Sequence, residues 1–199
     1  MNLRHGLVIA GLGLVPWAAQ ANLIVNGGFE SPDIATGTYS LFPVSITGWA
    51  TSVGPSIEIQ DNVAGAPFEG QQFVELDSTG NSGMAQSVPT VLGQGYLLSF
   101  AYSPRPGIAS GSNGIELWID GLLRDSFTGA GIGTTNWAIR SYSIVGDGST
   151  LIEFRAIGTS DSLGGYLDDV RLTTPEPGTL ALGGLALTAL ALLRRRRRA

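Results

Sequence analysis

The chain has no cysteine, no lysine and only one histidine among its 199 residues. Without cysteine it can form neither disulfides nor thiolate metal sites, and it has no cysteine nucleophile. The single histidine, His5, lies in a segment that we expect to be removed from the mature chain. The mature chain then lacks the base of a serine–histidine or cysteine–histidine mechanism and the most common zinc ligand. Few enzyme classes are compatible with these absences.

The N-terminal segment has the three parts of a secretory signal peptide. Arg4 precedes an uncharged apolar stretch at residues 7–15, and Ala19-Gln20-Ala21 has the small-x-small pattern of a signal-peptidase site. About nine to twelve apolar residues are too few for a good transmembrane helix, although an uncleaved anchor is the alternative. We therefore predict a helical signal peptide at residues 1–21, in which Ala19 and Ala21 are the small residues recognised by signal peptidase, and a mature chain that starts at Asn22.

The C-terminal segment also has three parts. Pro175, Glu176 and Pro177 form a hinge, because proline continues neither a strand nor a helix interior. Residues 179–193 follow without a charge, and five arginines occupy residues 194–198. As a helix of about 1.5 Å per residue this run reaches roughly 22 Å, against a membrane core of about 30 Å. It predicts a short transmembrane helix whose arginine tail stays on the cytoplasmic side.

Residues 175–199 closely resemble the PEP-CTERM sorting signal of Gram-negative bacteria, a tail also labelled an ice-binding-protein C-terminal domain. The resemblance implies recognition by an exosortase-type enzyme, which processes the tail near Pro175, Glu176 and Pro177. It also implies an inner-membrane intermediate, followed by delivery to the cell surface or extracellular matrix. A plain membrane anchor is the alternative, because short motifs give false matches. Whether the tail is cleaved or retained stays open.

Residues 22–174 form a region of one-domain length with a strongly acidic balance. They contain fifteen Asp and Glu residues against five arginines, so their net charge is about −10. Such a surface repels the phosphates of nucleic acids, and we expect no nucleic-acid partner. It favours the binding of cations instead.

Within this region, short segments of alternating apolar residues are separated by Gly, Ser, Asn and Pro at intervals of about ten residues, which is typical of an all-β sandwich or barrel. Asp120-Gly121 and Asp147-Gly148 predict tight hairpin turns. The best architecture is a jelly roll. The expected strands cover residues 22–26, 46–50, 56–60, 71–77, 83–88, 95–103, 114–120, 122–127, 136–145, 149–157 and 165–172.

A second resemblance rests on five motifs: Asn26-Gly27-Gly28-Phe29-Glu30, Trp49 after a Thr-Gly pair, Phe73-Val74-Glu75-Leu76-Asp77, Tyr102-Ser103-Pro104-Arg105-Pro106-Gly107 and Gly164-Gly165-Tyr166-Leu167-Asp168-Asp169-Val170. Together they resemble the galactose-binding-like domain of unknown function first noted in plant cell-wall proteins. That domain is similar in fold to carbohydrate-binding modules of the β-jelly-roll type. The resemblance spans nearly all of residues 22–174 and implies a galactose-binding-like jelly-roll sandwich. It says less about the ligand, because functions on this fold vary widely.

The same resemblance implies a structural calcium ion. In the resembling modules, the opening Phe-Glu segment and the closing Asp-Asp segment lie side by side and hold the ion. The corresponding positions here are Glu30 and Asp169, with Asp168 as a neighbour. Calcium takes six to eight oxygen ligands, which these side chains supply in part. The alternative is that Glu30 and Asp168 are solvated strand ends.

Strand alternation predicts a sugar-binding face. Trp118 shares its face with Glu116 and Asp120, opposite three aliphatic residues. Phe73 similarly shares a face with two acids, and Arg105 is fixed between two prolines. An aromatic ring stacks on the C–H face of a sugar while charged groups bond its hydroxyls. The predicted contacts are Trp118, Arg105, Phe73, Glu75, Asp77 and Glu116, with Trp49, Trp137 and Tyr142 as weaker additions. The alternative is that the tryptophans fill the core or cover a sheet edge.

These observations favour an exported cell-envelope or extracellular-matrix protein that binds a polysaccharide, an exopolysaccharide above all, without acting as an enzyme. A structural or adhesion protein without saccharide specificity is the main alternative. A glycoside hydrolase needs only two suitably spaced carboxylates, but no pair stands out in the sequence. The scattered threonines do not form the regular array that an ice-binding surface requires. The expected partners are signal peptidase, an exosortase-type enzyme, a polysaccharide and the membrane.

Overall fold

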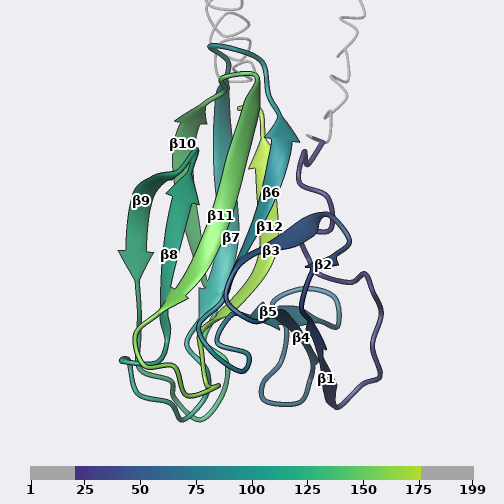
Figure 1. Ribbon diagram of the computed structural model, residues 1–199, viewed down its shortest axis with the longest axis vertical. Helices are drawn as coiled ribbons and strands as arrows, with labels where there is room; N and C mark the ends of the chain where they lie inside the picture. The colour runs from purple at the N-terminus through teal and green to yellow at the C-terminus, as the bar shows by residue number, and fades with distance from the viewer. Residues whose placement is uncertain (1–20, 176–199) are drawn as a thin grey trace, which may run out of the picture.

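Two antiparallel six-stranded sheets face one another in the computed structural model, which describes residues 21–175 (Figure 1). The first, sheet A, has the order β1-β4-β5-β12-β7-β10, and the second, sheet B, has the order β2-β3-β6-β11-β8-β9. The strands are β1 (Thr38–Phe42), β2 (Ser45–Ile46), β3 (Trp49–Val53), β4 (Ile57–Asp61), β5 (Phe73–Glu75), β6 (Gly83–Pro89), β7 (Gly95–Ser103), β8 (Gly114–Ile119), β9 (Leu122–Phe127), β10 (Ala138–Val145), β11 (Ser149–Ile157) and β12 (Tyr166–Thr173). The predicted all-β jelly-roll sandwich is confirmed.

The core lies between the two sheets and follows the period of two that strands impose. On β4, Ile57 and Ile59 are fully buried in it, and on β8 Ile115 and Leu117 are. Trp49 fills the core rather than a ligand site. Its ring lies 5.9 Å from that of Phe29 and 6.1 Å from that of Phe154, which ties the N-terminal segment to sheet B.

The structure departs from the predicted strands at the N-terminal side. Residues 22–26 form no strand, although the Leu23 amide donates to the Leu172 carbonyl at 2.9 Å. Asn26 and Phe29 have positive φ angles of 55° and 59°, which turn the chain away from the sheet. Strand β1 was not predicted. It is an edge strand whose Tyr39 and Leu41 are exposed, so it lacks the core-facing pattern by which strands are found.

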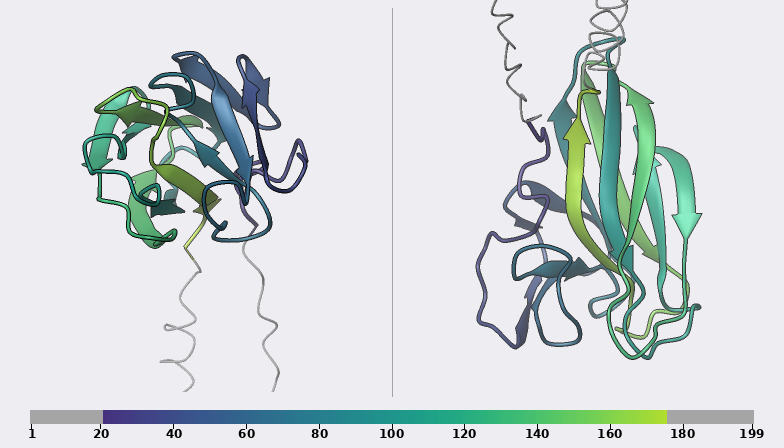
Figure 2. Two further views of the ribbon diagram at one scale, coloured as in Figure 1. Left: turned by 90° about the horizontal axis from the view of Figure 1, so that it is seen from below. Right: turned by 180° about the vertical axis from the view of Figure 1, so that it is seen from behind.

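The two ends of the sandwich differ (Figures 1 and 2). At one end lie both termini of the described chain, the loop between β6 and β7 and the loop between β10 and β11. At the opposite end lie the loop that follows β7 and the loop between β11 and β12. Residues 21–175 include no helix with the length and apolar character needed to cross a bilayer. The predicted signal peptide with Ala19, the residues Glu176 and Pro177, and the predicted membrane helix at 179–193 lie outside the described residues; Ala21 and Pro175 lie at their limits.

Candidate functional site

The outer face of sheet A carries a group of polar side chains that its strand alternation places together. Because Ile57 and Ile59 face the core, Glu58 and Gln60 of β4 face outward. The register then sets Tyr39 of β1 beside Gln60, and Glu75 of β5 beside Glu58. Three neighbouring strands therefore present aromatic, amide and carboxylate groups at one place.

The Gln60 amide joins the two carboxylates of this group. Its Nε2 donates to Glu58 Oε1 at 2.9 Å and to Glu75 Oε2 at 2.5 Å. Glu75 Oε1 accepts the backbone N–H of Gly164 at 2.5 Å, and its Oε2 pairs with the guanidinium of Arg105. The remaining amide atom, Gln60 Oε1, is buried without a hydrogen-bond partner. A buried acceptor without a partner costs free energy, so the Gln60 amide gains from any rearrangement that brings a donor to this atom.

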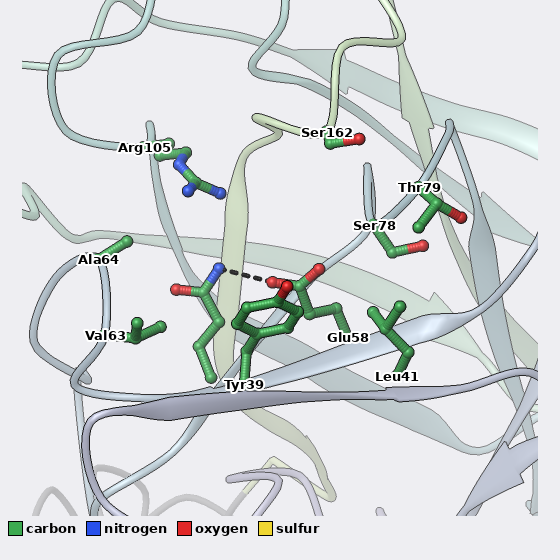
Figure 3. Close-up of a pocket in the computed structure, with 10 residues that line it drawn as sticks. Tyr39, Leu41, Glu58, Val63, Ala64, Ser78, Thr79, Arg105 and Ser162 are labelled. Atoms are coloured by element: carbon green, nitrogen blue, oxygen red, sulfur yellow. Dashed lines mark hydrogen bonds between the residues drawn. The ribbon is translucent and has the colours of Figure 1, made fainter.

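These side chains line a cavity of about 280 Å³. In Figure 3, Tyr39 and Glu58 project into it from neighbouring strands, with Arg105 and Ser162 across from them. A second cavity of about 560 Å³ adjoins it at the loop end and shares Val63, Ala64 and Arg105 with it. We call the two cavities together the Arg105 groove. The lining residues beyond the shared three are Tyr39, Leu41, Glu58, Gln60, Ser78, Thr79 and Ser162 in the first, and Gly65, Ala66, Pro106, Ile108, Gly133, Thr134 and Leu163 in the second.

Burial governs the charges of the groove. Loss of hydration raises the pKa of Glu58 to about 6, against a smaller lowering by Gln60 and Arg105. The pKa of Glu75 rises to about 9 from the same cause, and the nearby Arg105 cation offsets only part of the rise. Near neutral pH the floor of the groove therefore carries less negative charge than its two carboxyl groups imply. The groove suits a ligand of hydroxyl groups more than it suits a cation.

Two of the predicted sugar contacts lie near the groove but serve the fold. Phe73 is fully buried, with its ring 4.6 Å from that of Tyr166 and 5.9 Å from that of Trp137. Asp77 is also buried, and its Oδ2 accepts the backbone N–H groups of Asp161 and Ser162, both at 2.9 Å. Phe73 therefore supports sheet A from outside, whereas Asp77 shapes the loop that places Ser162 at the groove.

Trp118 and Glu116 do not belong to this site, because they lie on β8 of sheet B. They do share one outward face, as predicted: Trp118 Nε1 donates to Glu116 Oε2 at 2.8 Å. The guanidinium of Arg155 lies 4.3 Å from the centre of the Trp118 ring and is held by two hydrogen bonds to Glu153 at 2.7 and 2.8 Å. Arg155 therefore covers one face of the Trp118 ring. The sequence predicted that Trp118, Glu116 and Arg105 share one sugar-binding face. That prediction is wrong, because Trp118 and Glu116 lie on sheet B and Arg105 lies beside sheet A.

The predicted calcium residues do come together, because the Val170 amide donates to the Gly27 carbonyl at 2.9 Å and joins the closing segment to the opening one. Asp168 is not a candidate ligand: its carboxylate accepts the backbone N–H groups of Phe68, Glu69 and Asp169 at 2.8, 3.1 and 2.6 Å. Burial raises its pKa to about 7, although these three amides lower it. Asp168 thus fixes the loop before β5.

Glu30 and Asp169 remain as partial ligands for a cation. Glu30 Oε1 accepts the amides of Gln71 and Gln72 at 2.8 and 3.0 Å, whereas Asp169 Oδ1 pairs with Arg171 at 2.5 Å. Arg171 also pairs with Glu69 at 3.1 Å. Among residues 21–175, no three or more His, Cys, Asp or Glu side chains group closely enough to hold a metal. The two residues fit a calcium site only if Arg171 moves and other oxygens complete the set.

The sequence pattern does not predict Tyr39, Glu58 or Gln60 as site residues. A signal for the last two was present in the expected strand at 56–60, where Ile57 and Ile59 alternate with Glu58 and Gln60. No comparable signal marked Tyr39, because its strand was not recognised. Trp137 covers Phe73, and Tyr142 stacks on Phe100 at 5.9 Å, so both of these aromatic residues pack against the fold.

Known proteins are similar to this chain in two parts, its C-terminal segment and its β domain. Residues 173–198 match the PEP-CTERM protein-sorting motif. Over the β domain, the solved structure of TmCBM61 in complex with β-1,4-galactotriose superposes with a TM-score of 0.51 and 20% identity, and covers 78% of this chain and 99% of that one. The chain therefore has the jelly-roll fold of a carbohydrate-binding module.

Two curated proteins are similar in sequence. The multifunctional-autoprocessing repeats-in-toxin of Vibrio vulnificus is 31% identical over 153 residues, and that of Vibrio cholerae is 29% identical over 157 residues. These matches cover 75% and 77% of this chain, but the chain spans only 3% of the length of each relative. They connect the β domain to a small part of two much longer proteins.

Proposed function

We propose that this protein is exported and binds a saccharide in the Arg105 groove without a covalent step. The observation that carries the proposal is a cavity in which the exposed ring of Tyr39 lies beside the Gln60 side chain, whose Oε1 has no hydrogen-bond partner. A sugar hydroxyl satisfies the amide oxygen, whereas the apolar face of the sugar stacks on the tyrosine. The jelly-roll fold shared with TmCBM61, whose structure contains β-1,4-galactotriose, supports the same ligand class.

The charges of the groove favour a neutral saccharide. Glu58, whose pKa is about 6, carries negative charge at neutral pH and disfavours an acidic sugar, and the guanidinium of Arg105 is already held by Glu75. A chain of hexose units would extend from the first cavity into the second, past Arg105. The polymer we propose is a neutral exopolysaccharide at the cell surface or in the extracellular matrix.

The sorting-motif match at residues 173–198 supports delivery to this location. In the proposed sequence, signal peptidase removes the N-terminal segment and the C-terminal segment holds the chain in the inner membrane. An exosortase-type enzyme then processes the tail near Pro175 and releases the β domain towards its polysaccharide. Mass spectrometry of the protein from its native host, with the two chain ends determined, tests both processing steps.

A structural calcium ion is part of this proposal. Glu30 and Asp169 would hold it, and the ion would link the opening segment of the domain to its last strand. Burial and the neighbouring carboxylate of Asp169 raise the pKa of Glu69 beside them, which is typical of crowded negative charge that a cation relieves. The ion has no part in saccharide binding, because these residues do not line the Arg105 groove.

Hydrolysis is less favoured than binding. Glu58 and Glu75 are brought together by Gln60, as a glycosidase pair requires. However, Glu75 is fully buried, and its two oxygens are engaged by Gln60, Arg105 and Gly164, so it cannot reach a glycosidic bond. Adhesion without saccharide specificity is the second candidate, favoured by the exposed apolar residues elsewhere on the domain.

The test is binding of neutral oligosaccharides, β-1,4-galactotriose included, measured by a glycan array and by calorimetry. Tyr39→Ala removes the ring and Gln60→Leu removes the amide, and each is expected to lower affinity by about tenfold or more. Ile139→Ala is the matched control, because Ile139 is exposed on β10 at the other edge of sheet A. Failure of the chain to bind any neutral glycan would leave the adhesion role as the better explanation.

A further inference from the structure

Three exposed apolar side chains form a cluster at the end of the sandwich that carries the chain termini. Val91 and Leu92 in the loop between β6 and β7 are 66% and 78% exposed, and Val145 at the end of β10 is 67% exposed. The Gly93 amide donates to the Gly146 carbonyl, and the Gly146 amide donates to the Gln94 carbonyl, both at 2.8 Å. The two loops are thus joined, and the three side chains, here called the apolar tip, belong to one surface.

The apolar tip is held firmly, and the two loops that form it carry little charge. The Val91 amide donates to the hydroxyl of Tyr96 at 2.9 Å, which fixes the first loop to β7. Residues 88–97 contain no charged side chain, and residues 143–150 contain only Asp147, whose Oδ1 accepts the Ser149 amide at 3.1 Å. On a domain of net charge near −10, an uncharged apolar projection points to a partner that is itself apolar.

The position of the tip relative to the chain end identifies that partner. Thr173, the last residue of β12, pairs with Leu97, and the tip lies beyond this pair in the direction in which the chain leaves (Figure 1). Only five residues, 174–178, separate Thr173 from the uncharged run at 179–193. At about 3.3–3.6 Å per residue they reach no more than roughly 18 Å. While that run is in the bilayer, the tip is therefore held within reach of the headgroup region of the same membrane.

We propose that Val91, Leu92 and Val145 insert into the lipid surface while the sorting segment is still attached. This inference rests on the proposed membrane-bound stage. The Arg105 groove lies at the opposite end of the sandwich, so this contact directs the groove away from the membrane (Figures 1 and 2). A second copy of the chain is a poorer occupant, because it brings another strongly negative domain.

Site-specific labelling of the full chain in phosphatidylcholine vesicles tests this inference. The chain has no cysteine, so Leu92→Cys and Val145→Cys each give one site for an environment-sensitive fluorophore. Ala109→Cys, in an exposed loop at the opposite end, is the matched control. Lipid-borne nitroxide is expected to quench the labels at 92 and 145 but not the label at 109. The additional change Val91→Asp should weaken quenching at 145 by about tenfold, the effect of one buried valine, whereas Leu122→Asp on β9 should not.

Vesicle flotation separates the possible failures. If the chain does not float with the vesicles, its tail does not insert and the membrane-bound stage itself is wrong. If it floats but soluble iodide quenches the labels at 92 and 109 equally, the tip does not contact lipid and this inference alone is overturned. If the label at 92 becomes more shielded from iodide as the protein concentration in detergent rises, the tip binds a second copy of the chain and the inference of lipid contact is overturned.

Discussion

The guanidinium of Arg105 pairs with the carboxylate of Glu75, a side chain that is fully buried beneath the point where the two cavities of the groove meet. Glu75 lies on β5, and Arg105 follows the end of β7, so the pair joins a central strand of sheet A to a loop. Gln60 and Gly164 bind the same carboxylate. The floor of the groove is therefore also a structural connection, and changes to it affect stability and binding together.

Arg105→Ala is expected to lower the free energy of unfolding by about 1–3 kcal/mol, because it leaves an oxygen of the buried Glu75 carboxyl group without one of its hydrogen-bond partners. Urea unfolding measures it. Arg124→Ala is the control, since the contact of Arg124 is a 3.5 Å hydrogen bond to the Ser143 carbonyl. Equal losses in the two variants would show that the buried pair contributes nothing of its own.

Trp118→Ala is expected to leave saccharide affinity within about twofold of the parent, because the Trp118 ring lies beneath Arg155 on the other sheet. The substitution instead lowers the free energy of unfolding by about 1–2 kcal/mol, because the contacts of Trp118 with Arg155 and Glu116 are lost. Calorimetry with the saccharide that binds the parent, together with urea unfolding, separates the two effects. A tenfold loss of affinity with unchanged stability would return the binding site to sheet B.

The fold was predictable because strand alternation and turn residues are local signals. The Asp120-Gly121 turn shows this well: both residues have positive φ angles, 52° and 76°, and join β8 to β9 as their sequence predicts. The site was only partly predictable. The sequence placed Arg105 and Glu75 in one site, and the structure pairs them.

What could not be predicted was which strands meet. Two segments have the same local pattern of an aromatic residue near an acid, Trp118 with Glu116 and Phe73 with Glu75. The first lies on sheet B and the second on sheet A. Pairings such as β1 with β4 and β5 with β12 join residues far apart in the sequence, and no local pattern specifies them. The positions of Tyr39 and Gln60 depend on these pairings.

Stability is expected to fall as the pH rises from 5 to 8. Burial raises the pKa of Glu75 to about 9 and that of Asp168 to about 7, in each case above the value in the unfolded chain. The folded state thus keeps protons that the unfolded state releases. The contribution of these two groups to stability is therefore fully present below about pH 4 and is lost as the pH rises through their pKa values in the folded state. A decrease of at least about 2 kcal/mol is expected. Urea unfolding at several pH values measures it.

Glu75→Gln provides the control for this pH dependence. The amide keeps the size of the side chain but cannot titrate, so the stability of the variant should decline less steeply between pH 5 and 8 than that of the parent. Asp33→Asn, at an exposed position, should leave the parent's slope unchanged. A parent stability that is constant or that rises over this range would mean that both carboxyl groups are ionised in the folded state.

Calcium is expected to raise the unfolding temperature through Glu30 and Asp169. Because Arg171 already pairs with Asp169, the ion must displace a resident cation, and a weak site with a dissociation constant of about 1 mM is expected. At about 10 mM calcium such a site contributes roughly 1.4 kcal/mol. Arg171→Gln removes the competing cation, so this variant should be less stable without calcium and should gain more from it. Thermal unfolding with calcium and with a chelator measures both effects.

Two carboxylate variants separate a calcium ligand from a structural staple. Glu30→Gln should lose most of the calcium response, whereas Asp33→Asn, close in the sequence and exposed, should retain it. Asp168→Asn should lower stability equally with and without calcium, because its carboxylate binds three backbone amides rather than the ion. If the unfolding temperature responds to neither calcium nor chelator, in the parent and in Arg171→Gln alike, then no metal is needed to join the opening segment of the domain to its last strand.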